Sequence, residues 1–145
     1  MEMKPRLVDP REAREAALKF LYQCEMEKVY FYSESHFNSF LAYFPVEESS
    51  ATYCKKLVQD VFSHLTDVDQ CIQSHSANWS LARMSVVDRS VLRLAVAELN
   101  YHSTPFKVVL NEAIDLAKQY GSSESSAFVN GILDSYCTAT GRTPA

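Results

Sequence analysis

Residues 85–99, SVVDRSVLRLAVAEL, carry the pattern that decides the fold. Ser85 is a typical helix cap, because its hydroxyl can accept a hydrogen bond from the backbone amide of Asp88, three residues further on. The apolar positions that follow recur with the period of a helix and form a broad stripe: Met84, Val87, Val91, Leu92, Leu94, Ala95 and Leu99. So broad a stripe is typical of the central helix of a bundle. Glu98 lies at its edge, where a buried carboxylate needs a donor or a cation, so we interpret Glu98 as structural.

Helical patterns also flank this stretch on both sides. Asp9-Pro10-Arg11-Glu12 combines a cap, a proline at the first helical position and an early acid, and it predicts a helix from about Pro10 to about Met26. Further helices are predicted after Ser33, after Pro45 (one long helix or two joined by a kink), from Thr104-Pro105 to a stop at Gly121, and after a cap at Ser122 or Ser123. Gly131 inside the last helix suggests close approach of another helix.

The composition is that of one folded domain. The chain has 145 residues, of which 47% are hydrophobic, and only three glycines, which argues against hairpin-rich β architecture. We therefore expect an all-α, compact single-domain bundle of about six or seven helices over residues 1–145, with a flexible arm at 1–8 and a flexible tail at 138–145. The four cysteines have no paired spacing, and no apolar run is long enough to span a membrane, so a cytoplasmic protein with reduced thiols is expected.

Patterns for catalysis or cofactor binding are missing from the sequence. It has no glycine-rich phosphate loop, no nucleophile elbow and no zinc-protease motif. Cys71 and His75 lie one helical turn apart, but two ligands without two more make a poor zinc site. We expect no metal, no cofactor and no enzymatic activity. The net charge of −4 also excludes a large basic field, so any nucleic-acid binding must be local or shared with a partner.

The first helix has a second ridge opposite its predicted core face. Arg11, Arg14, Leu18 and Tyr22 recur at intervals of three, four and four residues, which places them on one side of a helix. One interpretation is an outward binding ridge. The alternative is a helix buried on two sides, with Leu18 and Tyr22 beneath another helix and the arginines in solvent.

Three stretches resemble the NusB family of transcription antitermination factors. Residues 81–95, LARMSVVDRSVLRLA, followed by Glu98-Leu99, are similar to the family's central helix. Residues 105–118 and 128–134, PFKVVLNEAIDLAK and FVNGILD, resemble its most distinctive part, and residues 13–18, AREAAL, with Leu21-Tyr22-Gln23, resemble its first helix. The resemblance implies an all-helical, non-enzymatic protein. Such a protein binds boxA RNA of ribosomal leader transcripts together with NusE, a small-subunit ribosomal protein, and connects indirectly to RNA polymerase and the other Nus factors.

The same resemblance implies site residues. The family's arginine-rich start falls on Pro10, Arg11 and Glu12, so one cation of that triplet remains; Lys4, Arg6 and Arg14 extend the predicted RNA-binding set. The surface toward NusE maps onto Tyr22, Asp88, Glu124 and Phe128, to which the ridge adds Leu18. Asp88 can serve as a capping residue as well as a contact, and Phe128 lies on a core stripe.

Two functions remain open from the sequence. The first is an RNA-binding half of a heterodimer. The second is a protein-interaction module, of which a homodimer is one form, with little RNA recognition of its own. Since Arg11 and Arg14 both lie off the predicted core face, we expect Arg11→Ala and Arg14→Ala to weaken RNA binding without unfolding the domain.

Overall fold

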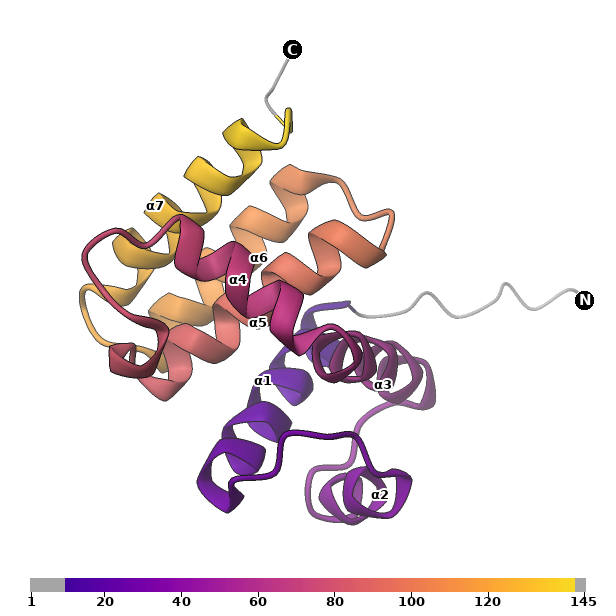
Figure 1. Cartoon of the computed structure of the whole chain (residues 1–145). Coiled ribbons are helices and arrows are strands. Elements are labelled where there is room, and N and C mark those ends of the chain that lie inside the picture. Colours follow the sequence, from indigo (N-terminus) through magenta and orange to yellow (C-terminus); the bar gives the residue numbers. More distant parts are fainter. Residues whose placement is uncertain (1–9, 143–145) are drawn as a thin grey trace, which may run out of the picture.

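The structure, a computed structural model, describes residues 10–142. This part contains seven α-helices and a short 3-10 turn, and no strand (Figure 1). The elements are α1 (Pro10–Glu27), α2 (Glu34–Tyr43), α3 (Glu48–Ser63), α4 (Leu65–Ser74), η1 (Leu81–Arg83), α5 (Val86–Tyr101), α6 (Phe106–Tyr120) and α7 (Ser125–Ala139). The all-α prediction is confirmed. No helix between residues 10 and 142 is both long and apolar enough to cross a membrane.

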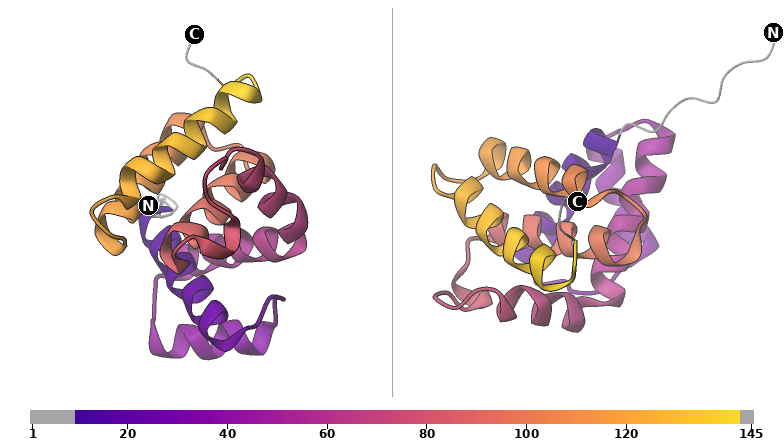
Figure 2. Two further views of the ribbon diagram at one scale, coloured as in Figure 1. Left: turned by 60° about the vertical axis from the view of Figure 1, so that its left-hand side comes forward. Right: turned by 90° about the horizontal axis from the view of Figure 1, so that it is seen from above.

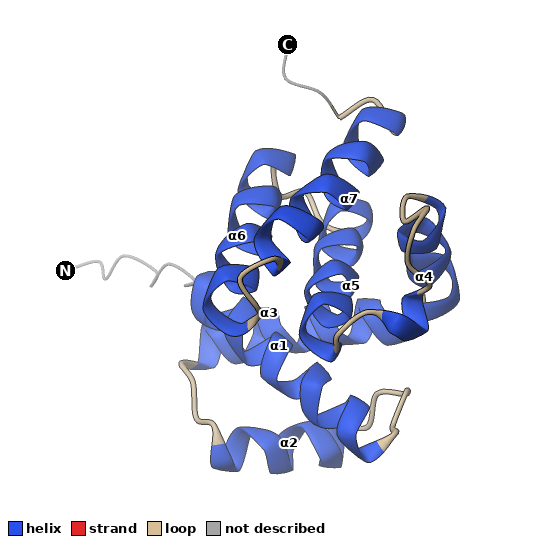
Figure 3. Ribbon diagram, turned by 90° about the vertical axis from the view of Figure 1, so that its left-hand side faces the viewer, coloured by secondary structure: helices blue, strands red, loops and turns tan. Residues whose placement is uncertain are grey.

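Helix α5 is the centre of the bundle, as its broad apolar stripe predicts. Every residue from Ser90 to Leu99 is buried, and α5 packs against α1, α3, α4, α6 and α7. It lies between α4 and the α6–α7 pair, whose two helices run beside each other (Figures 2 and 3). Helix α2 lies at one end, where Phe37 and Phe40 pack edge-on against Phe20 of α1. The end of α1, the start of α5 and the end of α6 lie around one depression of the surface.

Most predicted helix boundaries agree with the structure. The Ser85 hydroxyl accepts a hydrogen bond from the Asp88 amide at 3.1 Å, so the predicted cap is confirmed. The segment after Pro45 forms two helices that are separated at His64. The last helix is capped at Glu124 rather than at Ser122 or Ser123, although the Ser122 hydroxyl accepts a bond from the Glu124 amide. Helix α7 continues to Ala139, so residues 138 and 139 of the predicted tail are helical.

A buried ionic cluster fastens three helices together. The Glu25 carboxylate on α1 accepts hydrogen bonds from Arg89 and Arg93 of α5 at 2.7 and 2.8 Å, and Arg93 also forms a two-point pair with Asp69 of α4. These bonds fix the orientation of α5 relative to α1 and α4. They also engage two arginines that are therefore not available to a ligand.

The two glycines of the α6–α7 region have opposite environments. A Cβ on Gly121 would meet the Ala117 carbonyl oxygen at 2.7 Å and would also clash with the Ser125 side chain. A Cβ on Gly131 would meet no atom within 4 Å, so the predicted close approach of another helix at Gly131 is wrong.

We expect Gly121→Ala to lower the free energy of unfolding by about 1–3 kcal/mol, because the added methyl group has no space. Gly131→Ala, the matched control, should raise it by up to about 1 kcal/mol, since alanine favours an exposed helical position. Urea unfolding of both variants measures the two effects. Equal effects of the same sign would contradict this assignment.

Candidate functional site

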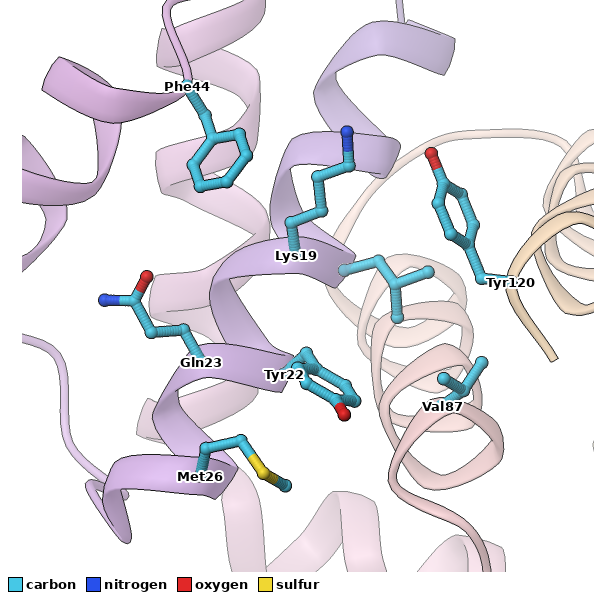
Figure 4. A pocket seen from close by; sticks show the side chains of 8 residues that line it. Lys19, Tyr22, Gln23, Met26, Phe44, Val87 and Tyr120 are labelled. Carbon is cyan, nitrogen blue, oxygen red and sulfur yellow. The ribbon is translucent and has the colours of Figure 1, made fainter.

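A large depression of the described surface lies along the outer side of α1. It has a volume of about 590 Å³ and is mostly apolar. Figure 4 shows its side chains: Tyr22 and Met26 extend from α1, Phe44 faces them from the end of α2, and Val87 and Tyr120 close the side toward α5 and α6. The side chain of Lys19 crosses it, with its ammonium 5.7 Å from the centre of the Phe44 ring and 5.9 Å from that of Tyr120. We call this depression the Tyr22 groove.

A second, more polar depression lies on the other side of the first turn of α5. It measures about 180 Å³ and is lined by Trp79, Arg83, Met84, Ser85, Asp88, Ser122, Glu124 and Phe128. Val87 borders the Tyr22 groove and the next residue, Asp88, borders this second depression, so the two depressions flank the first turn of α5. We call it the Asp88 pocket.

The structure thus brings together four of the predicted partner-binding residues. Asp88, Glu124 and Phe128 share one pocket although they come from two helices, and Tyr22, 44% exposed, lies in the Tyr22 groove. Trp79 and Arg83 also line the pocket, and neither was predicted from the sequence as a site residue. The sequence signal that could have identified Trp79 is a tryptophan in a polar segment between two predicted helices, where helical periodicity gives no information.

Leu18 does not have the outward position that the ridge predicts. Its side chain is 3% exposed and belongs to the core, with its remaining surface at the floor of the Tyr22 groove. The physical reason is that α1 packs against both α3 and α5, so its apolar surface extends over more than one face.

Arg14 also lacks the outward position that the ridge predicts. The prediction that Arg14 lies off the core face is wrong: the residue is 6% exposed. Its guanidinium donates two hydrogen bonds to the Glu98 carboxylate, at 2.8 and 2.5 Å, in the two-point geometry that strengthens an arginine–carboxylate pair. Because α5 places Glu98 beside α1, the arginine is drawn inward to neutralise it.

The surroundings of Glu98 confirm that this residue is structural. Tyr53 and Thr104 donate further hydrogen bonds to one carboxylate oxygen, at 2.7 and 2.9 Å. Burial by itself raises the pKa of a carboxyl group, but the hydrogen bonds from Arg14 and Tyr53 outweigh it and hold the pKa of Glu98 below its ordinary value. Glu98 is therefore a buried anion with a full set of donors.

Arg11 has the exposed position that the sequence predicts, with 62% of its side chain accessible. Its guanidinium nevertheless contacts two acids of α6: Glu112 at 3.3 Å and Asp115 at 3.2 Å. These carboxylates offset much of the positive charge at the start of α1. Lys4 and Arg6, the other cations predicted for RNA, lie outside the described residues.

Metal-binding side chains do not converge in the described part of the chain. No group of three or more histidines, cysteines, aspartates or glutamates within residues 10–142 is arranged to hold an ion. What the surface offers is a large apolar groove, a polar pocket and a few cations.

The sequence is similar to that of known proteins over most of its length. The NusB family profile matches residues 11–137. The chain is 44% identical over 136 residues to the transcription antitermination protein NusB of Myxococcus xanthus, covering 89% of this chain and 94% of that protein. It is 45% identical over 133 residues to the protein of the same name from Anaeromyxobacter dehalogenans, covering 92% of each.

The chain belongs to the NusB family. Its fold is similar to that of the NusB-family protein of T. maritima, with a TM-score of 0.80 at 34% identity over 91% of this chain and 93% of that one. It is also similar to a chain in the crystal structure of the antitermination factors NusB and NusE in complex with dsRNA. There the TM-score is 0.79 at 29% identity, over 89% of this chain and 96% of that one. The family assignment made from three sequence stretches is therefore confirmed.

Proposed function

We propose that this NusB-family chain is a transcription antitermination factor that binds boxA RNA together with NusE. The observation that carries the proposal is the pair of depressions that flank the first turn of α5, the apolar Tyr22 groove and the polar Asp88 pocket. An apolar groove next to a polar pocket suits a protein partner on one side and a polar ligand shared with that partner on the other. The solved complex of related factors with NusE and RNA supports the same combination.

The charges of the chain explain why RNA binding is shared. Sequence-independent affinity for RNA comes from lysines and arginines near phosphates. Among the described arginines, Arg14 and Arg93 are buried in ion pairs and Arg11 faces two carboxylates. The electrostatic attraction at the start of α1 is therefore weak, and in this proposal a basic partner supplies the rest. Lys4 and Arg6 add to it in this proposal.

The proposed mechanism is tethering in the cytoplasm, without covalent chemistry. The chain holds a transcript sequence and a ribosomal protein against each other, and the assembly contacts RNA polymerase and the other Nus factors. A small helical domain with a fixed ionic core suits this task, because a rigid surface loses little entropy on binding.

The experiment is a titration of the preformed complex with NusE by fluorescently labelled boxA RNA. We expect tighter binding to boxA than to a scrambled RNA of equal length, and a linear fall of log affinity with log salt between about 50 and 200 mM. Equal affinity for both RNAs, or no salt dependence, would contradict the proposal.

A second candidate function is a protein-interaction module with little RNA recognition. The pairing of Arg11 with Glu112 and Asp115 favours it, because it leaves little net positive charge at the start of α1. In that case the Tyr22 groove would be covered by a protein, such as a second copy of this chain. The boxA titration separates the two functions, since such a module would bind NusE or itself without affecting RNA.

A further inference from the structure

The loop that carries Trp79 is held in place by four hydrogen bonds made by the side chains of Gln73 and Ser76. The Gln73 side-chain amide donates to the Trp79 carbonyl at 3.1 Å and to the Ser76 carbonyl at 3.3 Å, while its oxygen accepts from the Leu81 amide at 2.7 Å. The buried Ser76 hydroxyl also donates to the Trp79 carbonyl, at 2.7 Å. One glutamine thus fastens the backbone on both sides of the tryptophan.

The next turn, at residues 81–84, is held by a side chain of α5. Arg89 of α5 donates to the carbonyls of Leu81 and Met84, at 3.1 and 2.9 Å, and its position is fixed in turn by Glu25. The backbone from Trp79 to Met84 is therefore rigid. Yet Trp79 itself is 51% exposed, and within residues 10–142 its indole makes no hydrogen bond or ring contact. A rigid backbone that presents an exposed tryptophan is a prepared binding surface.

The rest of the Asp88 pocket indicates the kind of ligand. Arg83 extends from the same turn, and no ion pair or hydrogen bond engages its side chain within the described part of the chain. Neither carboxylate oxygen of Asp88 has a hydrogen-bond partner among the described residues; one of the two is sealed from solvent, and the other is the acceptor open to a ligand in the pocket. The pocket therefore combines an aromatic face, an available cation and an acceptor that needs a donor.

We infer that the Asp88 pocket binds one unpaired RNA base, stacked on Trp79, with its N–H edge donating to Asp88 and its phosphate near Arg83. The inference rests on the proposed function. It adds Trp79 and Arg83 to the RNA-contacting residues, and it assigns Asp88 to RNA in place of the contact with NusE that the family resemblance implies. Stacking on aromatic side chains is the usual way in which proteins hold unpaired bases. A carboxylate accepts from the amino group of cytosine and repels the carbonyl oxygens of uracil, so the pocket prefers an amino-bearing base.

The single tryptophan of the sequence makes this pocket directly observable. We expect boxA RNA to quench the emission of Trp79 in the complex with NusE, with the Trp79→Phe complex measured in parallel to subtract any signal of the partner. A short oligocytidylate should quench more strongly than an oligouridylate of equal length. Asp88→Asn should reduce that difference.

Affinities provide the second readout. Trp79→Ala should weaken boxA binding by the complex about 5- to 100-fold, the range expected for one lost stacking contact. Trp79→Phe should retain most of the affinity, because a ring remains. Phe31→Ala, which removes a 65% exposed aromatic ring that lines neither depression, is the matched control and should have no effect. Arg83→Gln should lower the slope of log affinity against log salt by about 1.

The outcomes are distinguishable. If RNA binds the complex but Trp79 emission and the affinity of Trp79→Ala are unchanged, the pocket takes no base while the proposed function stands. If Trp79→Ala weakens binding of NusE without RNA, the surface is a protein contact and the inference is overturned. If the complex binds no RNA, the inference and the proposed function both fail.

Discussion

Arg14→Ala is expected to lower the free energy of unfolding by about 3–5 kcal/mol. The reason is that Glu98 would remain buried without its cation, and removal of one partner of a buried ion pair leaves an uncompensated charge. Glu98 is 3% exposed at its side chain, so its carboxylate lies away from bulk solvent. Urea unfolding followed by circular dichroism measures the loss.

Arg11→Ala on the same helix is the matched control. Its ion pairs lie in solvent, where such pairs contribute about 0–1 kcal/mol, so its stability should stay close to that of the unmodified chain. The sequence pattern treats the two arginines alike, whereas the structure separates them. Equal stability of the two variants would show that Arg14 is not buried as described.

The same pair gives stability a defined dependence on pH. The pKa of Glu98 is lower in the folded chain than the value of about 4.3 for an unfolded glutamate. Its contribution is therefore complete above about pH 4.3 and is lost as pH falls through the lower, folded pKa. In Glu98→Gln, this part of the dependence of the free energy of unfolding on pH should be absent.

Tyr22→Asp should weaken binding of NusE about 30-fold or more. Tyr22 lies in the wall of an apolar groove, and a carboxylate there would lose its water when the partner binds. A loss of 2 kcal/mol or more is typical of a central aromatic contact, and 1.4 kcal/mol corresponds to a tenfold change. Isothermal titration of NusE into the variant measures the effect.

Tyr43→Asp makes the same chemical change outside the groove. Tyr43 is 84% exposed at the end of α2 and does not line the Tyr22 groove, so this variant should bind NusE normally. If both variants lose affinity equally, the added charge acts at long range and the groove is not the contact surface.

The fold was predictable because its signals are local. The Ser85 cap, the stripe of α5 and the start at Pro10 each depend on residues a few positions apart, and each is found in the structure. The positions of Arg14 and Leu18 were not predictable in this way. Periodicity places them on the same side of α1 as Arg11 and Tyr22, but burial depends on which helices pack there. The partner of Arg14 is Glu98, 84 positions away in the sequence.

The candidate site was predictable only where a family resemblance existed. Asp88, Glu124 and Phe128 were selected in that way, and they share one pocket. Trp79 and Arg83 lie between regular helices, in a segment shaped by the side chains of Gln73 and Arg89. A periodicity analysis does not detect such contacts, so the most exposed aromatic and cationic groups of the pocket appear only in three dimensions.

The central claim is that this chain and NusE form one RNA-binding surface that neither half provides alone. The most direct test compares the affinity of the isolated chain for boxA RNA with that of the chain saturated with NusE, at one salt concentration, with NusE alone as the reference. The account predicts that affinity rises at least about tenfold when the partner is present, beyond the affinity of NusE by itself. An affinity that the partner leaves unchanged would contradict it.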